Sequence, residues 1–556
     1  MTAGAGRAGK DKVLWRIVRI TALVGVLTAC AAAPPRPRLV VLLSIDQMRA
    51  DYVDRFRQDW TSGLERLASD GARFSRAAYP YLNTVTCVGH STMSTGTLPY
   101  HHGMVLNGWW DRDAGRQVTC TGDPNERLVP YLAGAAAAGE GNSLRRLERP
   151  TFADELRSQL ATPTHVVGLS LKARSAMTLA GRRADVVAWL DDAAGWVTSS
   201  AYGTTPAPFL ARFFEANPIA ADRGRTWTPM LPEAAYLFPD DGVGERPPAG
   251  WTRTFPHPLA DGAATSAADF EDRWTASPWS DEYLERAAEQ AVEQLNLGRG
   301  PGTDFLGIGF SALDYVGHAF GPRSQEVQDT LARLDRTLGR FFALLDRRVG
   351  RDQYVVALTS DHGVAPLPEQ QVEAGLDAGR IDLKGLAARV EDVLAGGLGA
   401  GRHVAALLYT DLYFTSGTLA SIDARPGLME KVLETIASWP GIAAAYPGRD
   451  LRTPAAHLDP DRRPAALSYF PGRSGDVVIV PKIYWIATGN GTTHGTAAAY
   501  DQRIPVILMG PSFRRGEYLG AASPADIVPT LAHVTGVTMA QTDGRVLTEA
   551  LLIPEP

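Results

Sequence analysis

The stretch RLVVLLSID, residues 38–46, predicts the centre of the fold. It is apolar without alternation from Leu39 to Ile45 except for one serine. A run of this length that is apolar on both faces is typical of a parallel strand buried inside an α/β sheet. The run ends on Asp46, whose carboxylate can bind a metal ion. We therefore expect a buried strand with a functional carboxylate at its end.

Three more runs share this design, apolar along the strand and polar where the strand ends. They are residues 165–171 (HVVGLSL) before Lys172, 304–313 (DFLGIGFSAL) before Asp314, and 353–360 (QYVVALTS) before Asp361 and His362. In open α/β sheets, functional sites gather at the carboxyl ends of the strands. Four such strand ends predict one site at one edge of the sheet.

Helical patterns separate these runs. One helix is expected after Ser280, with Asp281 in its first turn, and another after Ser324, because serine caps helices and acids favour the first turn. The chain then returns to the core with a strand over residues 504–509 and a helix over 524–535. The alternation predicts an α/β fold.

Length and composition allow a large enzyme core with insertions. The chain has 556 residues and a net charge of −6, and so balanced a charge argues against a nucleic-acid-binding protein. Residues about 190–280 and 365–475 break the strand–helix rhythm. We expect these two segments to be insertions that cap the sheet.

The first residues indicate export. A basic segment precedes the short apolar stretch 20–29, which is too short to span a bilayer. It ends in Leu-Thr-Ala before Cys30, which resembles a bacterial lipobox. We expect residues 1–29 to be a signal peptide, Cys30 to carry lipid, and residues 30–38 to form a proline-rich tether. The alternative is an ordinary secretory signal that happens to contain a cysteine.

Export has a consequence for the other two cysteines. The chain has only three cysteines, and with Cys30 lipidated, Cys87 and Cys120 remain. Because an exported protein folds in an oxidising compartment, we expect these two to form a disulfide.

Metal-ligand residue types accumulate along the chain. Asp314 and His318 lie four residues apart, so one turn could direct both at one ion. Asp361 and His362 adjoin at a strand end, where Gly363 permits a sharp turn. Two further candidates are Asp46 and His494, the latter in the polar loop GNGTTHGT. Aspartate and histidine are usual ligands of catalytic zinc.

The segment NTVTCVGHST, residues 83–92, contains the candidate nucleophile. A small polar turn that opens a helix presents a hydroxyl to backbone amides that favour anions. Spacing alone does not choose between Thr84, Thr86 and Ser91.

The complete set resembles the alkaline phosphatase superfamily. The order and spacing of its motifs are similar to those in the branch that contains nucleotide pyrophosphatase/phosphodiesterases and phosphate-irrepressible alkaline phosphatases. The motifs are Asp46 in SIDQMRADY, Thr86 in TVTCVGH, Asp314-x-x-x-His318, Asp361-His362-Gly363 and His494. The resemblance covers about residues 37–550 and implies a three-layer αβα catalytic domain over residues 39–556.

The resemblance also implies two zinc ions. One would be held by Asp314, His318 and His494, and the other by Asp46, Asp361, His362 and the Thr86 oxygen. Thr86 would accept the phosphoryl group, and water would then hydrolyse the phosphothreonine. Oxygen and imidazole ligands accept several divalent ions, so another metal is the alternative.

Substrate class depends on a third set of residues. Lys172 and Arg174, with Asn107, resemble the Asn and Lys-x-Arg set of the Thr-nucleophile alkaline phosphatases in this branch. The extra negative charge of a phosphate monoester requires such donors. Ala173 stands between the two cations where a relative has aspartate, which puts the rigidity of the pair in doubt.

The first prediction is therefore a zinc-dependent phosphomonoesterase whose partners are small-molecule phosphate monoesters and, through a lipid anchor only, the membrane. It would be a periplasmic or cell-envelope lipoprotein. A phosphodiesterase or nucleotide pyrophosphatase on the same scaffold is the alternative. A non-catalytic binding protein and a relative of phosphoglycerate mutase are less consistent with Thr86 and the complete ligand set. The oligomeric state is not predicted.

Overall fold

The computed structural model describes Met1 and residues 36–134 and 139–552. Cys30 and, apart from Met1, the predicted signal segment 1–29 lie outside these residues. In the described part of the chain, no helix combines the length and the apolar character needed to cross a membrane.

A ten-stranded sheet forms the centre of the molecule, and its middle strands are the four predicted ones. They lie side by side in the order β14, β1, β13, β8, and all three neighbouring pairs are parallel. β9 adds a fifth parallel strand. Their bounds are β14 Tyr354–Thr359, β1 Leu39–Ile45, β13 Asp304–Phe310, β8 Val166–Ser170 and β9 Val186–Asp191. The predicted α/β fold with a buried parallel sheet is confirmed.

Antiparallel pairs flank this parallel centre. On one side β9 pairs with β10 and β10 with β6, and on the other β14 pairs with β21 and β21 with β2, while β22 runs parallel to β2 at the edge. The bounds are β10 Gly195–Ser199, β6 Leu128–Pro130, β21 Ile507–Met509, β2 Ala72–Phe74 and β22 Gly516–Tyr518. The sheet is therefore mostly parallel at the place where the ligand residues leave it.

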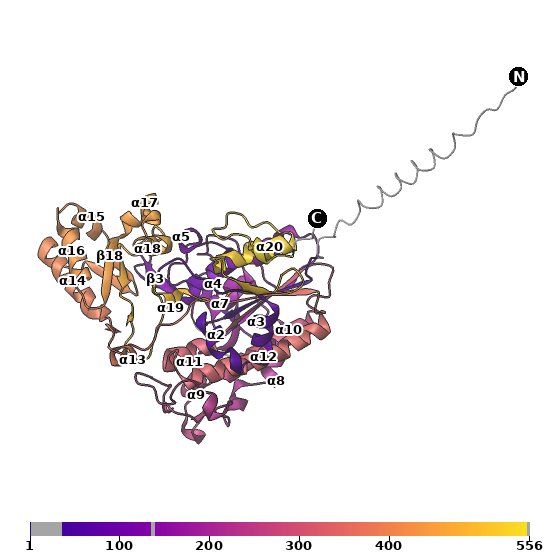
Figure 1. Ribbon diagram of the computed structural model, residues 1–556. Coiled ribbons are helices and arrows are strands. Elements are labelled where there is room, and N and C mark those ends of the chain that lie inside the picture. Colours follow the sequence, from indigo (N-terminus) through magenta and orange to yellow (C-terminus); the bar gives the residue numbers. More distant parts are fainter. Residues whose placement is uncertain (2–35, 135–138, 553–556) are drawn as a thin grey trace.

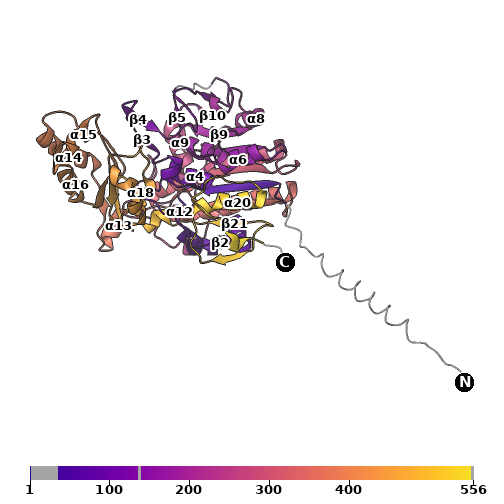
Figure 2. The same ribbon diagram turned by 90° about the horizontal axis from the view of Figure 1, so that it is seen from above.

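Helices cover both faces of the sheet (Figures 1 and 2). Along β1, Leu39, Val41 and Leu43 belong to one hydrophobic core and Val40 and Leu42 to the other, because successive side chains of a strand point to opposite faces. The first face packs on α3 Gly63–Asp70, α10 Pro278–Gln294, α11 Ala312–Phe320 and α12 Gln325–Arg348, and the second on α4 Thr86–Thr95, α6 Phe152–Gln159, α7 Ala173–Ala180 and α20 Ile527–Thr535.

Two local predictions need correction. The predicted cap at Ser280 is wrong, because α10 begins at Pro278 after Ser277, and proline fits the first position of a helix well. The strand predicted over 304–313 ends at Phe310, and α11 begins at Ala312. Asp281 explains this early turn, since its Oδ1 accepts the amides of residues 311 and 312 at 2.9 and 3.1 Å. By contrast, Ser324 caps α12 as expected, accepting the amide of Val327.

The first inserted segment follows β10 at residue 200 and extends to α10. It contains α8 Pro208–Ala216, α9 Ala267–Thr275 and the short strands β11 Thr226–Trp227 and β12 His257–Pro258. Its aromatic residues join the core under α10 and α12, and the Trp227 indole donates to Asp329 on α12 at 2.7 Å. This segment therefore has no separate core among the described residues and packs into the main one.

The second inserted segment builds a smaller sheet with a separate core (Figure 1, orange). Its strand order is β16, β17, β19, β18, and the helices α14 and α16 pack on it. The bounds are β16 Val404–Leu408, β17 Asp411–Phe414, β18 Ile442–Pro447, β19 Val477–Pro481, α14 Leu383–Leu398 and α16 Leu428–Ala437. Because β19 is a central strand of this sheet, the segment extends past residue 475.

Candidate active site

The predicted ligand residues meet at the carboxyl ends of the parallel strands. Asp46 follows β1, Asp361 and His362 follow β14, and Asp314 lies in the first turn of α11 just beyond β13. Because these strands are neighbours, side chains that are more than 250 residues apart in sequence lie within contact distance.

Asp46, Asp361 and His362 form the first ligand group. One donor atom from each lies within 4.8 Å of the others, and all three residues are buried. His362 Nε2 is 3.4 Å from Asp46 Oδ1 and 3.3 Å from Asp361 Oδ2. Within the described residues, these two carboxylate oxygens have no hydrogen-bond partner. Buried carboxylate oxygens without partners are costly, so the group fits a cation.

Asp314, His362 and His494 form the second ligand group, again fully buried. The sequence assigns His318 rather than His362 to this set. The structure places His318 Nε2 3.2 Å from Asp314 Oδ1 but leaves its side chain 35% exposed at the rim of the group. His362 belongs to both groups, so the two candidate metal positions adjoin.

The three histidines are oriented by the backbone. Nδ1 of His318, His362 and His494 lies 2.8, 3.0 and 2.8 Å from the carbonyl oxygens of Thr492, Gly363 and Thr84. A carbonyl oxygen only accepts, so each Nδ1 carries the proton and each Nε2 presents a lone pair to the site. Burial lowers the pKa of His362 and His494, which keeps these rings neutral, as metal ligands must be.

Thr86 is the first residue of α4 and is buried beside both groups, with its Oγ1 3.4 Å from His362 Nε2. The structure separates it from the other two hydroxyl candidates. Thr84 donates to the carbonyl of Thr496 and Ser91 to that of Cys87. Thr86 is therefore the candidate whose hydroxyl faces the ligand groups.

Close packing holds α4 against the end of β14. A Cβ added to Gly89 would lie 2.0 Å from the Asp361 carbonyl oxygen, so only glycine fits there. One helical turn after Thr86, the Nδ1 of His90 is 3.0 Å from the Thr86 carbonyl oxygen and 3.2 Å from Asp361 Oδ2. The start of α4 is thus fixed to a ligand of the first group.

Asn107 and the disulfide lie next to this helix. The structure joins Cys87 and Cys120 in a disulfide, the pairing that the cysteine count predicts. Asn107 Oδ1 accepts the Cys87 amide at 2.8 Å, and its own carbonyl accepts the Cys120 amide at 2.9 Å. Both contacts fix Asn107 beside Thr86, and its side-chain NH2 group remains a donor.

Lys172 lies between the ligand groups. It precedes α7, is only 6% exposed, and donates from Nζ to Asp46 Oδ2 at 2.6 Å and Asp314 Oδ2 at 2.5 Å. Burial opposes its charge, but Asp314 and Asp46 raise the pKa of Lys172 above its usual value. Arg174, in the first turn of α7, is half-buried, and its Nε has no hydrogen-bond partner in the described chain.

Sequence reasoning missed two residues of the site. Gln47 has a left-handed backbone (φ 68°), and it donates from Nε2 to Asp314 Oδ1 at 2.7 Å and from its amide to Asp361 Oδ1 at 3.2 Å. It thereby connects the two ligand groups. His90 is the other, and its position four residues after Thr86, on the same helix face, was the available signal.

Fold and site together define an α/β protein with two adjoining candidate metal groups and a threonine beside them, at the carboxyl edge of a parallel sheet. Residues 40–501 match the family model for type I phosphodiesterase / nucleotide pyrophosphatase. The chain belongs to this family and is an enzyme.

Individual relatives cover almost the whole chain. Alkaline phosphatase PafA of Elizabethkingia meningoseptica is 30% identical over 511 residues, which are 90% of this chain and 92% of the relative. Alkaline phosphatase PhoK of Sphingomonas sp is 31% identical over 546 residues, 93% of this chain and 91% of the relative. The crystal structure of wild-type PafA superposes with a TM-score of 0.85 at 30% identity, over 93% of this chain and all of that one. The predicted resemblance and the predicted architecture are confirmed.

A second solved PafA structure carries substitutions at one threonine, one asparagine, one lysine and one arginine. It has a TM-score of 0.85 at 28% identity and covers 93% of this chain. In that protein the threonine and the asparagine have the same sequence separation as Thr86 and Asn107, and the lysine and arginine are two residues apart, like Lys172 and Arg174.

Proposed function

We propose that this enzyme hydrolyses phosphate monoesters through a phosphothreonine on Thr86 and releases inorganic phosphate. The observation that carries the proposal is the position of the Thr86 hydroxyl, 3.4 Å from Nε2 of His362, the residue common to both ligand groups. With a nucleophile at that point, the attacking oxygen and the leaving oxygen would each face one of the two candidate metal positions. The similar alkaline phosphatases PafA and PhoK support the same reaction.

We assign the metal positions to the seven residues that the sequence predicts. Asp46, Asp361, His362 and Thr86 would hold one zinc ion, and Asp314, His494 and His318 the other, with His362 close enough to contribute to both. Imidazole ligands in each set favour zinc over magnesium or calcium. Two bound divalent ions supply charge stabilisation and lower the pKa of a coordinated hydroxyl.

The chain's own residues then divide the chemistry. Thr86 Oγ attacks phosphorus, the new Oγ–P bond forms as the ester O–P bond breaks, and the alcohol leaves with a proton. Water next cleaves the Oγ–P bond and gives phosphate. The Asn107 amide and the Lys172 and Arg174 cations bind the non-bridging oxygens, whose charge is greatest in a monoester.

These three donors decide between the two candidate reactions. A phosphodiesterase would share the fold, the metal groups and Thr86, and the family model carries that name. The donor set favours the monoester, because it places two cations and one amide where a diester has less charge to stabilise. The matching residue types substituted in the PafA variant support this choice.

The test is a comparison of kcat/KM for p-nitrophenyl phosphate and bis-p-nitrophenyl phosphate, with purified protein, added Zn²⁺ and an EDTA control. We expect a large preference for the monoester and loss of activity in EDTA. A preference for the diester would assign the enzyme to phosphodiester cleavage and leave the three donors without a catalytic role.

We also propose that the enzyme is an exported lipoprotein of the cell envelope. The proposal rests on the lipobox-like end of the signal segment at Cys30, and the Cys87–Cys120 disulfide is consistent with an oxidising compartment. Mass spectrometry of the mature chain should find a lipid-modified Cys30 as its first residue. An N-terminus at another residue would contradict it.

A further inference from the structure

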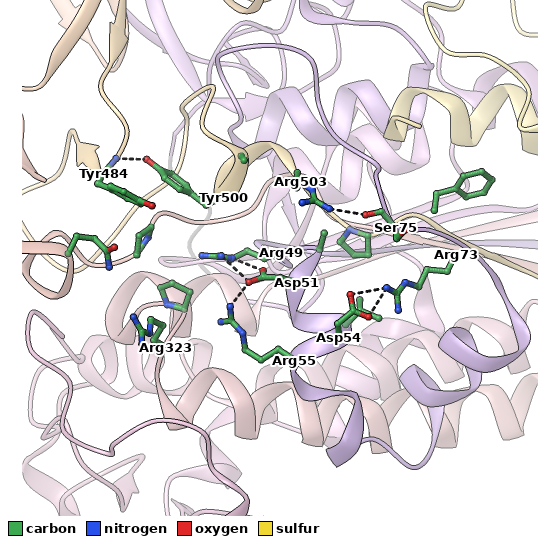
Figure 3. A pocket seen from close by; sticks show the side chains of 18 residues that line it. Arg49, Asp51, Asp54, Arg55, Arg73, Ser75, Arg323, Tyr484, Tyr500 and Arg503 are labelled. Carbon is green, nitrogen blue, oxygen red and sulfur yellow. Dashed lines mark hydrogen bonds and ion pairs between the residues drawn. The ribbon is translucent and has the colours of Figure 1, made fainter. Parts of the chain in front are cut away.

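A cavity of about 560 Å³ lies near the ligand groups but contains none of the predicted site residues (Figure 3). Five arginines and only two carboxylates line it. We call it the arginine cavity, and its charged residues are Arg49, Arg55, Arg73, Arg323, Arg503, Asp51 and Asp54.

The two carboxylates are already engaged. Asp51 accepts two hydrogen bonds from Arg49, at 2.8 and 3.0 Å, and one from Arg55 at 2.5 Å. Asp54 accepts from Arg73 at 2.6 Å. These ion pairs neutralise part of the charge, and Arg73 also lies 3.5 Å from Glu517, which does not line the cavity.

Arg323 and Arg503 add two further positive charges to the cavity. Among residues 36–134 and 139–552, neither has a carboxylate within ion-pair distance. The Arg503 guanidinium donates to the Ser75 carbonyl at 3.1 Å, and the Arg323 guanidinium lies 5.4 Å from the ring centre of Phe238. In Figure 3, the two residues lie on opposite sides of the Arg49–Asp51 pair. The cavity therefore carries a formal excess of positive charge.

We propose that the arginine cavity binds a small dianion of the phosphate class, at a site separate from the catalytic centre. Guanidinium groups present paired donors that match phosphate oxygens, and the volume lies in the range of small-molecule sites. Tyr484 and Tyr500, stacked with ring centres 5.8 Å apart, form one wall. The ligand is either free phosphate or the phosphate group of an organic ester.

The cavity shares its walls with the loops that carry the first ligand group. Arg49 follows Asp46 by three residues, and its Nη1 lies 3.3 Å from the Val364 carbonyl, just beyond His362. The Gly363 amide donates to the Asp501 carbonyl, next to Tyr500. An anion in the cavity would thus lie behind the metal-ligand loops, and the proposal does not depend on which ester the enzyme cleaves.

The competing explanation is that Arg323 and Arg503 are solvated surface charges, since both side chains are exposed. The two explanations differ in one measurable respect. Solvated charges leave phosphate binding at the catalytic centre alone, whereas a built site adds a second equivalent.

The experiment is isothermal titration of the zinc-loaded protein with inorganic phosphate and, separately, with phenylphosphonate, which is not hydrolysed. We expect two equivalents to bind to the wild type and one to Arg323→Ala/Arg503→Ala. Each lost charged contact should weaken binding at the cavity about tenfold or more. Loss with both probes indicates that a free phosphate group suffices, and loss with phenylphosphonate alone indicates an organic ester.

Two variants keep the test decisive. Arg323→Ala alone removes a guanidinium with no hydrogen bond in the described chain, so it should fold even if the Arg503 change does not. Arg336→Ala removes an exposed arginine of α12 and should bind both equivalents. A single equivalent of each probe in the wild type, or an unchanged titration in both cavity variants, would overturn the proposal.

Discussion

The residues of the candidate metal groups (the ligand side) lie at the ends of the sheet strands. The donors proposed to bind the phosphoryl group (the cation side) come from loops and helices around the sheet. Asp46, Asp361 and His362 follow fully buried strands and are themselves buried. Asn107 lies in a loop and Arg174 on a short helix, and both are half-buried. In the proposed mechanism, the ligand side makes the reaction possible, while the cation side selects the substrate. Lys172, which contacts a carboxylate of each ligand group, is the residue where the two sides meet.

The largest effect is expected for Thr86→Ala. Removing the hydroxyl should lower kcat for p-nitrophenyl phosphate by at least about 10³-fold, because no covalent intermediate can form. Metal content, measured by elemental analysis, should stay close to that of the wild type, because the aspartates and histidines remain. Turnover near the wild-type rate would refute the nucleophile assignment.

The next effect compares two histidines that the structure places differently in the site. His362→Ala should reduce activity and metal content more than His318→Ala does, because His362 belongs to both ligand groups and His318 is partly exposed. We expect losses of about 10³-fold and about 10²-fold or less, respectively. Equal losses, with one ion missing in each variant, would contradict the larger role expected for His362.

The cation side should control selectivity. Lys172→Ala/Arg174→Ala should lower kcat/KM for the monoester about 100-fold and for the diester less than about tenfold, because two charged hydrogen bonds to the monoester are lost. Arg174→Ala alone provides the control, since no ion pair joins Arg174 to a ligand carboxylate in the described chain. If only the double variant has an effect, and it is equal on both substrates, Lys172 serves the ligand groups rather than the substrate.

The sequence predicts the ligand side better than the cation side for a physical reason. A buried parallel strand has an unmistakable apolar pattern, and the residue that ends it is placed by the sheet. Neighbouring strands therefore bring Asp46, Asp314 and Asp361 together once the fold is known. The contact of Lys172 with two carboxylates depends on side-chain directions that no pattern encodes.

Backbone contacts within the site could not be predicted from the sequence. The proton on each histidine is set by a carbonyl group, such as that of Thr84 or Thr492, and any residue type supplies a carbonyl. Gln47 is missed because its left-handed backbone is rare outside glycine. The early end of β13 at Phe310 is missed because the Asp281 carboxylate, on a helix distant in sequence, accepts the amides of residues 311 and 312.

The smallest predicted effect comes from the second inserted segment, which has its own core but contacts the ligand side. Tyr409, between β16 and β17, has a left-handed backbone (φ 57°), and its hydroxyl is 2.9 Å from Thr493 Oγ1, next to His494. Strained residues of this kind occur where the surrounding structure fixes them for function. The same turn is hydrogen-bonded to the loop that precedes α4, because Thr410 Oγ1 donates to Asn83 Oδ1 at 2.8 Å.

Tyr409→Phe removes one hydroxyl and keeps the ring, so the fold should be unchanged. We expect kcat to fall about 3- to 10-fold, with KM nearly constant and weaker zinc retention in a chelator titration, because His494 is held less firmly. Tyr446→Phe is the matched control, since that hydroxyl lies in the same segment and donates to the Asp461 carbonyl at 3.4 Å. If both variants match the wild type, the segment folds and functions apart from the site. If Tyr409→Phe alone loses zinc, the inserted segment helps to hold the metal ligands, together with the sheet.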